Sequence, residues 1–344
     1  MDFLTYLETA ASEINEEMEK FFQSWSKEVA SVSPKLISLN KVFIQASEGG
    51  KRLRGALVKL GYEMAGGKEN ADILKAAVAF EIFQTAILAH DDIIDLSPLR
   101  RGKPTVYKAL GGDHYAISQT ICLGDIGYFL AVRSISQSNF PDQEKNQALS
   151  LFAQAMLDTA LGQMLDVQLP HEKDSAREAD ALAVFRLKTA RYTISGPLHL
   201  GAIVGGANKK LIDDIAEFGS NLGIAFQIQD DILGVFGDEA TLGKSVTSDI
   251  EEGKNTLLFI QALKKASAEK KKVLDSYYGK GKIGQQELEQ IKKVFVDTGA
   301  LEYSQKKAAQ LVEEAKAVVK TMDIAEDKRF LLYQMADFLV SRKK

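Results

Sequence analysis

Cysteine and proline are scarce in this chain of 344 residues, which has one cysteine, Cys122, and six prolines. A single cysteine excludes an intrachain disulfide and is typical of a protein in a reducing compartment. Proline interrupts helices, so its scarcity, beside abundant alanine, leucine, glutamate and lysine, favours long helices over sheets. The net charge of −4 gives no general reason to expect a nucleic-acid partner, and we expect the basic residues to act locally.

Long hydrophobic runs and targeting signals are missing as well. No apolar run reaches the roughly 18–20 residues that a transmembrane helix needs. The first residues, Met1 to Leu4, lack the basic start of a signal peptide, and acidic residues such as Glu8 and Glu13 argue against an organelle transit sequence. We therefore expect a cytoplasmic protein without a transmembrane segment.

What the chain does have is apolar residues at helical spacing. Residues 2–30 repeat them every three to four positions, and residues 71–95 are apolar enough to be buried within a bundle. The other predicted helices, separated by glycine-rich turns, are 113–135, 143–168, 177–204, 208–236, 253–270, 284–295, 300–322 and a tail from 325. The sequence therefore predicts an all-α fold, a single domain over residues 1–344, with about ten or more helices around a central cavity.

An acidic cluster closes the predicted helix 71–95. A helix advances about 100° per residue, so relative to Asp91, Asp92 lies at about 100° and Asp95 at about 40°. Gln84 lies two turns earlier on the same side, at about 20°. Carboxylates gathered in this way repel one another unless a cation joins them, and hard oxygen ligands suit Mg²⁺. A solvated helix end is the alternative, but the preceding turns are apolar and should be buried.

Two further predicted helices also end in acid. Asp230 and Asp231 follow an apolar stretch of 208–236, with Gln227 three positions before Asp230, and Asp166 closes the helix 143–168. Alone, Asp166 is equally typical of an ordinary helix-end acid. Bundle cores are common places for metal and ligand sites, so the three acidic helix ends predict a carboxylate-lined cavity at one mouth of the bundle.

Basic residues accompany the acidic ones. Lys51 and Arg54 follow the break at Gly49-Gly50, about one helical turn apart, and Arg100-Arg101 directly follows the first acidic cluster. Each alone is typical of surface charge. Because guanidinium groups bind phosphates bidentately, basic residues beside a metal site indicate a substrate with several negative charges, most simply a diphosphate.

These motifs resemble those of the trans-prenyltransferases, the polyprenyl (isoprenyl) diphosphate synthase family. In chain order they are Gly49-Gly50-Lys51-Arg52-Leu53-Arg54, Asp91–Asp95 with Arg100-Arg101-Gly102, Gly162-Gln163-x-x-Asp166, Lys188-Thr189-Ala190, Phe226-Gln227-x-x-Asp230-Asp231 and Gly253-Lys254. Each is short, yet six in the family's order leave little room for chance. The resemblance implies the isoprenoid synthase fold, and the predicted helices agree with it over nearly the whole chain.

The resemblance also implies a reaction, the head-to-tail condensation of isopentenyl diphosphate with an allylic diphosphate. The allylic diphosphate ionises, the double bond of isopentenyl diphosphate attacks the carbocation, and the leaving diphosphate takes the proton that is lost. Ionisation needs charge neutralised on the leaving group, whereas the cation needs a dry apolar pocket with a few oriented dipoles. The family further implies three Mg²⁺ ions with substrate bound, and a homodimer.

A role is implied for each residue that matches a family motif. Those implied to hold the metals are Asp91, Asp92, Asp95, Asp166, Asp230 and Asp231. Those implied to hold isopentenyl diphosphate are Lys51, Arg54, Gln84 and Arg101. Those implied to hold the allylic diphosphate are Arg100, Lys188, Lys244 and Lys254. Those implied to stabilise the developing cation are Lys188, through its carbonyl, Thr189 and Gln227.

The chain departs from the family's pattern at two positions. Gly234 stands where the second aspartate-rich motif carries its third aspartate, which predicts a weaker metal site there. Gln84 stands where many longer-chain members carry histidine, and either side chain can donate to a phosphate. We expect neither departure to abolish activity.

A stripe on the predicted helix 71–95 bears on product length. His90, Ala86 and Phe83 lie on one side of this helix with Ile87 beside them, and in the family this stripe lines the pocket into which the product grows. Ala86 leaves room where short-chain enzymes tend to place an aromatic, and Phe83 lies about 4.5 Å deeper, about one isoprene unit. We therefore predict Phe83 as the floor and a C20 product, geranylgeranyl diphosphate. A C15 product, a product of C25 or longer, and a plain core role for Phe83 stay open.

Three other interpretations compete with an active synthase. A silent partner subunit of a heteromeric synthase should have lost motif aspartates or arginines, which this chain keeps apart from Gly234. A class I terpene cyclase needs no second diphosphate site, so Lys51, Arg54 and Arg101 argue against it. A phosphohydrolase built on His90-Asp91 lacks supporting histidine ligands, and we expect His90 to be a packing or pocket-wall residue.

Overall fold

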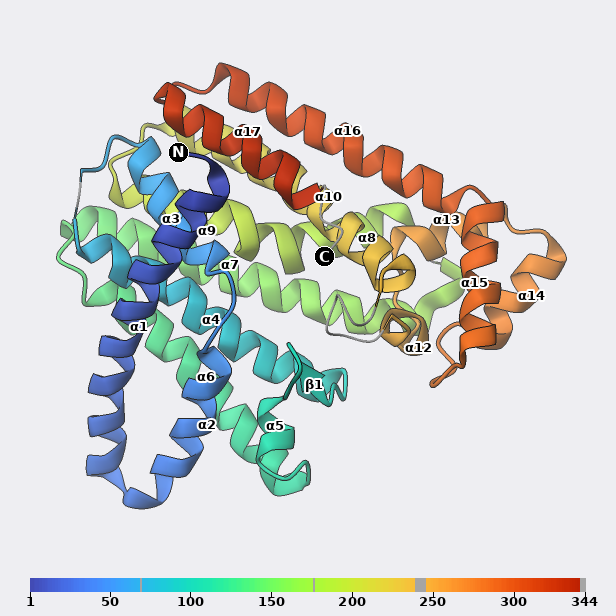
Figure 1. The fold of residues 1–344 in the computed structure, drawn as a ribbon, viewed down its shortest axis with the longest axis horizontal. Coiled ribbons are helices and arrows are strands. Elements are labelled where there is room, and N and C mark those ends of the chain that lie inside the picture. The colour runs from blue at the N-terminus through green and yellow to red at the C-terminus, as the bar shows by residue number, and fades with distance from the viewer. Residues whose placement is uncertain (69, 176, 239–245, 341–344) are drawn as a thin grey trace. The chain divides into compact units, whose positions relative to one another are not determined.

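The computed structural model describes residues 1–68, 70–175, 177–238 and 246–340, which are almost entirely helical (Figure 1). The elements of the first half are α1 (Phe3–Val32), η1 (Pro34–Leu36), α2 (Ile37–Ser47), α3 (Leu53–Met64), α4 (Asp72–Ile94), α5 (Val106–Ala109), α6 (His114–Ser136), α7 (Asp142–Gln168) and η2 (Leu169–Ser175). Those of the second half are α8 (Glu178–Val184), η3 (Phe185–Ser195), α9 (Gly196–Val204), α10 (Lys209–Phe236), α12 (Ser248–Glu252), α13 (Leu257–Lys265), α14 (Ala268–Tyr277), α15 (Gln285–Asp297), α16 (Ala300–Thr321) and α17 (Glu326–Val340). The predicted all-α class is confirmed.

One small hairpin interrupts the helices. Strands β1 (Leu99–Arg100) and β2 (Lys103–Pro104) pair antiparallel, with Arg100 opposite Lys103, around a turn in which Arg101 and Gly102 both have positive φ. Within the described ranges these are the only strands. The hairpin follows α4 directly, so it carries Arg100 and Arg101 back beside the end of that helix (Figure 1).

The described helices group into two compact units, each built from three stretches of chain. The first unit is Met1–Ala153, Gly196–Asp213 and Asp323–Leu331. The second unit is Gln154–Ser195, Asp214–Met322 and Leu332–Lys344. The single domain expected over residues 1–344 stays a prediction, and each unit is described by itself.

In the first unit, α4 is the central helix. It packs against α1, α2, α3, α5, α6 and α9, and its residues from Ala76 to Phe83 are all buried. Around it, α1 buries one apolar stripe, including Phe3, Leu7 and Ile14, as its periodicity predicts. The side chain of Asp2 caps α1 by accepting a hydrogen bond from the Thr5 N–H at 2.8 Å. The central place of α4 explains why its sequence is apolar on nearly every side.

In the second unit, α13 packs against α8, α15 and α16. Phe259 on α13 stacks on Tyr278 with ring centroids 4.0 Å apart, and Tyr278 contacts Phe295 of α15 edge-on. The Tyr278 hydroxyl donates to the Lys254 carbonyl at 2.6 Å. This aromatic cluster therefore fixes the backbone of the segment that carries Lys254.

Two predicted helices are divided in the structure. Residues 177–204, expected as one helix, form α8, a π-helix over η3 and then α9. Residues 253–270 are divided because Ser267 leaves the helical conformation and caps α14, accepting from the Lys270 N–H at 3.4 Å. Neither a π-helix nor a change of direction between two helices alters the apolar period enough to be recognised in the sequence.

Two helices, α4 and α6, are long and apolar enough to cross a membrane when judged by length and composition alone. A buried core helix passes the same test, and 67% of the apolar window of α4 is buried inside the protein. For α6 the buried share is 39%, because one side of this helix is exposed. The expected absence of a transmembrane segment stays a prediction.

Candidate active site

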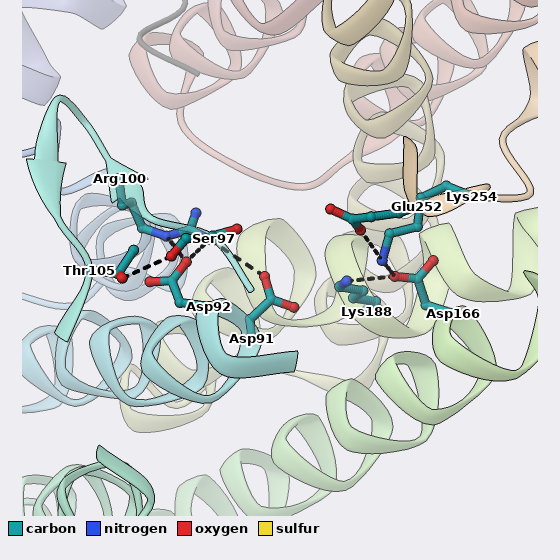
Figure 2. Close-up of polar contacts among 9 residues, drawn as sticks. All are labelled: Asp91, Asp92, Ser97, Arg100, Thr105, Asp166, Lys188, Glu252 and Lys254. Carbon is teal, nitrogen blue, oxygen red and sulfur yellow. Dashed lines mark hydrogen bonds and ion pairs between the residues drawn. The ribbon is translucent and has the colours of Figure 1, made fainter. Parts of the chain in front are cut away.

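The first acidic cluster is held by an arginine from the hairpin. The Nε and Nη2 atoms of Arg100 both donate to Asp92 Oδ1, at 2.8 and 2.6 Å, and Nη2 lies 3.6 Å from Asp91 Oδ2 (Figure 2). Asp92 is 2% exposed, so its charge is balanced inside the protein by Arg100. The structure therefore pairs Asp92 with a basic side chain, while Asp91 lies on the more open side of the same guanidinium.

The chain between α4 and the hairpin is fixed by its own backbone. The Ser97 N–H donates to the Asp92 carbonyl at 2.9 Å, and the Thr105 hydroxyl donates to the Ser97 carbonyl, also at 2.9 Å (Figure 2). Asp95 ends α4, and its N–H donates to the Asp91 carbonyl at 2.8 Å. The predicted metal ligands Asp91 and Asp95 thus lie one turn apart at a well-defined helix end.

Burial is the main influence on the Asp92 carboxyl. It raises the pKa of Asp92 above its ordinary value, and the hydrogen bonds and charge of Arg100 oppose it without cancelling it. A carboxylate in this position is costly to leave without a cation, which explains why Arg100 uses two donors on one oxygen.

The basic residues predicted to hold isopentenyl diphosphate lie at the start of α3 and in the hairpin turn. Lys51 lies two residues before α3 begins and Arg54 is the second residue of that helix, while Gln84 lies on α4 seven residues before Asp91. The Arg101 guanidinium lies against the backbone of Gly50, where a Cβ would come within 2.8 Å of Nη1. Glycine at position 50 therefore allows the hairpin arginine to approach the basic loop.

The second acidic cluster, in the other unit, is centred on Asp166 of α7. The Nζ atoms of Lys188 and Lys254 lie 2.7 and 3.0 Å from Asp166 Oδ2, and Lys254 Nζ also lies 3.1 Å from Glu252 Oε2 (Figure 2). Burial alone would raise the pKa of Asp166, but the two lysines outweigh it and hold the pKa below its ordinary value. Asp166 is therefore a carboxylate in the folded protein.

A close approach between α7 and the π-helix brings these groups together. A Cβ at Gly162 would come within 2.4 Å of the Lys188 backbone nitrogen, so only glycine fits there. Asp166 follows Gly162 by about one helical turn and so faces the Lys188 side chain. π-Helical segments are uncommon and occur often at functional sites, and this one carries both Lys188 and Thr189.

Three predicted site residues of this unit form a hydrogen-bonded chain. The Thr189 hydroxyl donates to Gln227 Oε1 at 2.7 Å, and Gln227 Nε2 donates to Asp231 Oδ1 at 2.7 Å. Asp231 is 6% exposed, whereas Asp230, the preceding residue, is less buried. Asp231 thus fixes the orientation of the Gln227 amide.

A carboxylate from another helix lies near Gly234, the position of the missing third aspartate. A Cβ at Gly234 would lie 2.9 Å from Asp249 Oδ2, a carboxylate supplied by α12. The sequence comparison with the family motif detected the loss at Gly234 but not this neighbour, because the contact joins two separate helices. Lys244, predicted to hold the allylic diphosphate, lies outside the described residues.

No three histidine, cysteine or acidic side chains of the described part of the chain converge closely enough to hold a metal ion by themselves. The donors that do lie at the helix ends are carboxylate oxygens, the ligand type that Mg²⁺ prefers. Asp166 is deprotonated, as a metal ligand must be. The donor set therefore fits Mg²⁺ in its chemistry.

The stripe predicted to line the product pocket faces α6. Phe83, 1% exposed, packs against Tyr128 of α6 and Phe152 of α7, with ring centroids 5.7 and 5.6 Å apart. His90 Nδ1 lies 3.2 Å from the Tyr128 hydroxyl and its Nε2 lies 3.0 Å from the Ile121 carbonyl. Both ring nitrogens of His90 therefore lie beside polar atoms of α6.

Ala86 and Ile87 belong to the same stretch of α4. Ala86 is fully buried, and a Cβ at Gly127 of α6 would come within 2.7 Å of its Cβ, whereas Ile87 is partly exposed. Tyr128, which touches both Phe83 and His90, was not recognised from the sequence. A tyrosine within a predicted helix carries no local signal of its role, since only packing joins it to α4.

In both units, acidic side chains near helix ends pair with basic ones, as at Asp92 and Asp166. The polyprenyl synthetase family model matches residues 38–295. A geranylfarnesyl diphosphate synthase of Aeropyrum pernix is 34% identical over 301 residues, 86% of this chain and 91% of that protein. A geranylgeranyl pyrophosphate synthase of Geoglobus acetivorans is 33% identical over 86% of this chain and 87% of that protein.

A solved structure shows the same fold. The geranylgeranyl pyrophosphate synthase of Corynebacterium glutamicum, in complex with isoprenyl diphosphate and magnesium, superposes with a TM-score of 0.91 at 30% identity, covering 99% of this chain and all of that one. The chain belongs to the polyprenyl synthetase family. The predicted resemblance, the isoprenoid synthase fold and the prenyltransferase class are thereby confirmed.

The pairing of Asp166 with two lysines predicts a pH-dependent contribution to stability. We expect Asp166→Asn to lower the free energy of unfolding at neutral pH by about 1.5–3 kcal/mol, the range for hydrogen bonds to charged groups. Because the folded pKa lies below the usual value of about 3.9, this difference should persist above that pH and shrink as the pH falls through the folded pKa. Denaturant unfolding of the wild-type protein and of Asp166→Asn across pH 2–7 measures this difference in the free energy of unfolding.

Asp180→Asn is the matched control, since Asp180 pairs with the largely exposed Arg177 in the same unit. An exposed pair should change the stability by less than about 1 kcal/mol. A deficit for Asp166→Asn that is the same at every pH would contradict the assignment of Asp166 as an ionised partner of the lysines.

Proposed function

We propose that the chain condenses isopentenyl diphosphate head-to-tail with an allylic diphosphate and makes a short-chain all-trans prenyl diphosphate, with C20 geranylgeranyl diphosphate as the main product. The observation that carries the proposal is the pairing of acidic with basic side chains at two of the three acidic motifs. Arg100 binds Asp92 in one unit, and Lys188 and Lys254 bind Asp166 in the other. Acidic and basic groups in such contact suit a substrate that carries its own negative charge and arrives with cations.

The acidic residues would hold the metal ions. Mg²⁺, three ions in the family, would neutralise the leaving diphosphate when bound to Asp91, Asp95, Asp166 and Asp230. Asp92 and Asp231 support these ligands, and the structure assigns them partners in Arg100 and Gln227. Arg100, Lys188, Lys254 and, outside the described residues, Lys244 would donate to the oxygens of the allylic diphosphate.

The hydrogen-bonded chain of the second unit suits a developing carbocation. The Thr189 hydroxyl donates its hydrogen bond to Gln227, so its oxygen lone pairs, the negative end of the dipole, would face the cation. The Lys188 carbonyl, in the π-helix, supplies a second dipole. The proton lost after attack goes to an oxygen of the leaving diphosphate, so no histidine base is needed.

Isopentenyl diphosphate must bind without being ionised, which favours a basic site without metal. Lys51, Arg54 and Arg101 would pair with its phosphates, and the Gln84 amide would donate to them. In a silent subunit or a terpene cyclase, these basic residues would have no second diphosphate to bind. We therefore propose that the partners are small-molecule substrates and that the chain binds no nucleic acid. A cytoplasmic location stays a prediction.

The proposed product length rests on the packing of α4 against α6 and α7. Phe83, held between Tyr128 and Phe152, supports a floor about one isoprene unit below Ala86. Relatives of this chain are named as C20 and as C25 synthases, so the longer product is the nearest alternative.

Purified protein with Mg²⁺, isopentenyl diphosphate and dimethylallyl, geranyl or farnesyl diphosphate should form mainly the C20 product, by chromatography of the dephosphorylated alcohols. Phe83→Ala should shift the products to C25 and longer, because the ring that closes the pocket is removed. No condensation with any starter would favour the silent subunit, and an unchanged product with Phe83→Ala would show that Phe83 is not the floor.

Tyr128→Phe is the control for this change, because it keeps the ring against Phe83 and removes only the hydroxyl near His90. Its product should stay C20. Truncating a buried phenylalanine costs about 3–5 kcal/mol, so both variants should be assayed below their measured unfolding temperatures.

We also propose that Asp249 replaces the aspartate missing at Gly234, since its carboxylate lies where that side chain would begin. Asp249→Asn should then raise the Mg²⁺ concentration for half-maximal activity, by about tenfold if one charged ligand interaction is lost. The double variant Gly234→Asp/Asp249→Asn should restore it, because the carboxylate returns from the other helix.

The single variant Gly234→Asp is the control for that exchange, since it sets two carboxylates against each other and should not improve Mg²⁺ use. If Asp249→Asn leaves the Mg²⁺ dependence unchanged, Asp249 does not act at the metal site.

A homodimer is proposed from the family and supported by exposed apolar side chains on α6. Ile121, Ile126 and Phe129 lie on the solvent side of this helix, and Phe129 is 76% exposed. Apolar surface of this kind marks an interaction site, and a two-fold dimer covers it with its own copy. The stripe Leu157, Leu161 and Met164 of α7 is exposed in the same manner.

Light scattering should therefore give twice the chain's mass of 37.8 kDa, and Phe129→Asp should give a monomer or a much weaker dimer. Phe330→Asp, at an exposed phenylalanine of α17, should leave the mass unchanged. A monomeric wild-type protein at micromolar concentration would contradict the dimer.

A further inference from the structure

One buried acid of α4 has no role in the reaction described so far. Glu81 is 3% exposed and lies three residues before Gln84. Its Oε2 lies 3.5 Å from Arg52 Nη1, and its Oε1 accepts the Gly55 N–H at 2.9 Å. Arg52 is itself 6% exposed, so the ion pair is buried. Both partners of Glu81 belong to the loop and first turn that carry Lys51 and Arg54.

The backbone at Arg52 is held in an uncommon conformation. Arg52 has φ of 50°, in the left-handed region, and occupies the N-cap position of α3 without a side-chain cap of its own. Its Nε donates to Asn15 Oδ1 of α1 at 2.7 Å, which leaves Nη1 directed to Glu81. The left-handed residue is thus tied to two other helices, and this fixes the directions in which the residues on either side of it leave the loop.

Glu81 also replaces the missing cap of α3. The Gly55 N–H belongs to the first turn of that helix, where backbone donors lack partners within the helix. A carboxylate at a helix N-terminus is favoured by the helix dipole as well as by the hydrogen bond. One side chain of α4 therefore binds both the start of α3 and the residue before it.

The surrounding charge gives Glu81 a second function. The pKa of Arg101 is lowered by burial and by the charges of Arg54, Arg52 and Arg100, while Glu81 acts in the opposite direction. Arg101 touches the same loop at Gly50. Arginines that repel one another would separate without a negative charge among them, and Glu81 supplies that charge before any substrate binds.

We propose that Glu81, acting through Arg52, is the positioning residue of the isopentenyl diphosphate site. It fixes the loop so that Lys51 and Arg54 meet the phosphates in one geometry, and it keeps the arginines together in the absence of substrate. This role rests on the function proposed above, in which Lys51, Arg54 and Arg101 bind isopentenyl diphosphate. Arg52 does not bind substrate in this scheme, because its guanidinium is buried against Glu81 and Asn15.

Glu81→Gln is the informative change, because glutamine keeps an oxygen for the Gly55 N–H and removes only the charge. We expect the KM for isopentenyl diphosphate to rise by about tenfold or more, as misplaced binding groups do, while the KM for the allylic substrate changes by less than about twofold. Steady-state kinetics with each substrate varied in turn measure both.

Glu63→Gln is the matched control at the other end of α3. Glu63 pairs with Lys328 at 2.6 Å, away from the basic loop, so its loss should lower the unfolding temperature without changing either KM. If Glu81→Gln lowers the unfolding temperature but leaves both KM values unchanged, Glu81 serves the fold only, and the inference is overturned.

The double variant Arg52→Met/Glu81→Gln separates positioning from the cost of an unpaired buried charge. It leaves no uncompensated charge, so the unfolding temperature should recover. The KM for isopentenyl diphosphate should stay raised, because the loop has lost its tie to α4 and α1. A KM that returns to the wild-type value would overturn the inference.

Calorimetric binding of isopentenyl diphosphate in EDTA keeps this test independent of turnover. Without metal, binding reports the basic site alone, and Glu81→Gln should weaken it by about tenfold, in line with the expected KM. Wild-type protein that binds but does not condense, with weaker binding by Glu81→Gln, would contradict the synthase and support the positioning role. If the wild-type protein is active and Glu81→Gln binds isopentenyl diphosphate as tightly as the wild type, the synthase is supported and the positioning role is contradicted.

Discussion

Charges buried inside a protein need partners of opposite sign, and the candidate site residues of each unit are arranged around that constraint. Three charged residues of the motifs are paired with an opposite charge from a different element: Asp92 with Arg100, Asp166 with Lys188 and Lys254, and Arg52 with Glu81. A buried ion without a partner is unfavourable, so the loss of either member of a pair should destabilise the fold around it. The pairs therefore hold the helix ends in place as well as the charges, and the local fold around each motif depends on them.

In the proposed reaction these pairs are exchanged. A diphosphate that approaches Lys188 and Lys254 offers them oxygens in place of Asp166, and Asp166 is then available to a cation. Because the groups are already desolvated, the exchange replaces one partner by another and avoids much of the cost of removing water at the moment of binding. The proposed isopentenyl site would differ, since Glu81 is buried and bound to Arg52 and the start of α3.

The helices and the acidic motifs could be predicted from the sequence because both are local. Apolar residues at three-to-four spacing predicted α1, and α4 was recognised by its length and apolar content. The partners were not local: Tyr128 meets Phe83, Asp249 lies at Gly234 and Glu81 meets Arg52, each across two elements. A glutamate inside an apolar helix gives no sign of whether it faces an arginine. The π-helix at Lys188 likewise changes hydrogen bonding without changing the apolar pattern.

In the proposed function, helix α4 would join the chemistry to the product length. It carries Glu81, Phe83, Gln84 and the aspartates from Asp91 within one rigid element. Phe83 and Asp91 are eight residues apart, so helical rise fixes their separation along the axis at about 12 Å. The aspartates and the proposed pocket floor therefore cannot move independently along this helix. If Phe83 is the floor as proposed, product length would change through side-chain size on α4 or at Tyr128 of the facing helix. Shifting α4 itself would displace Glu81 from Arg52 and so disturb the basic loop.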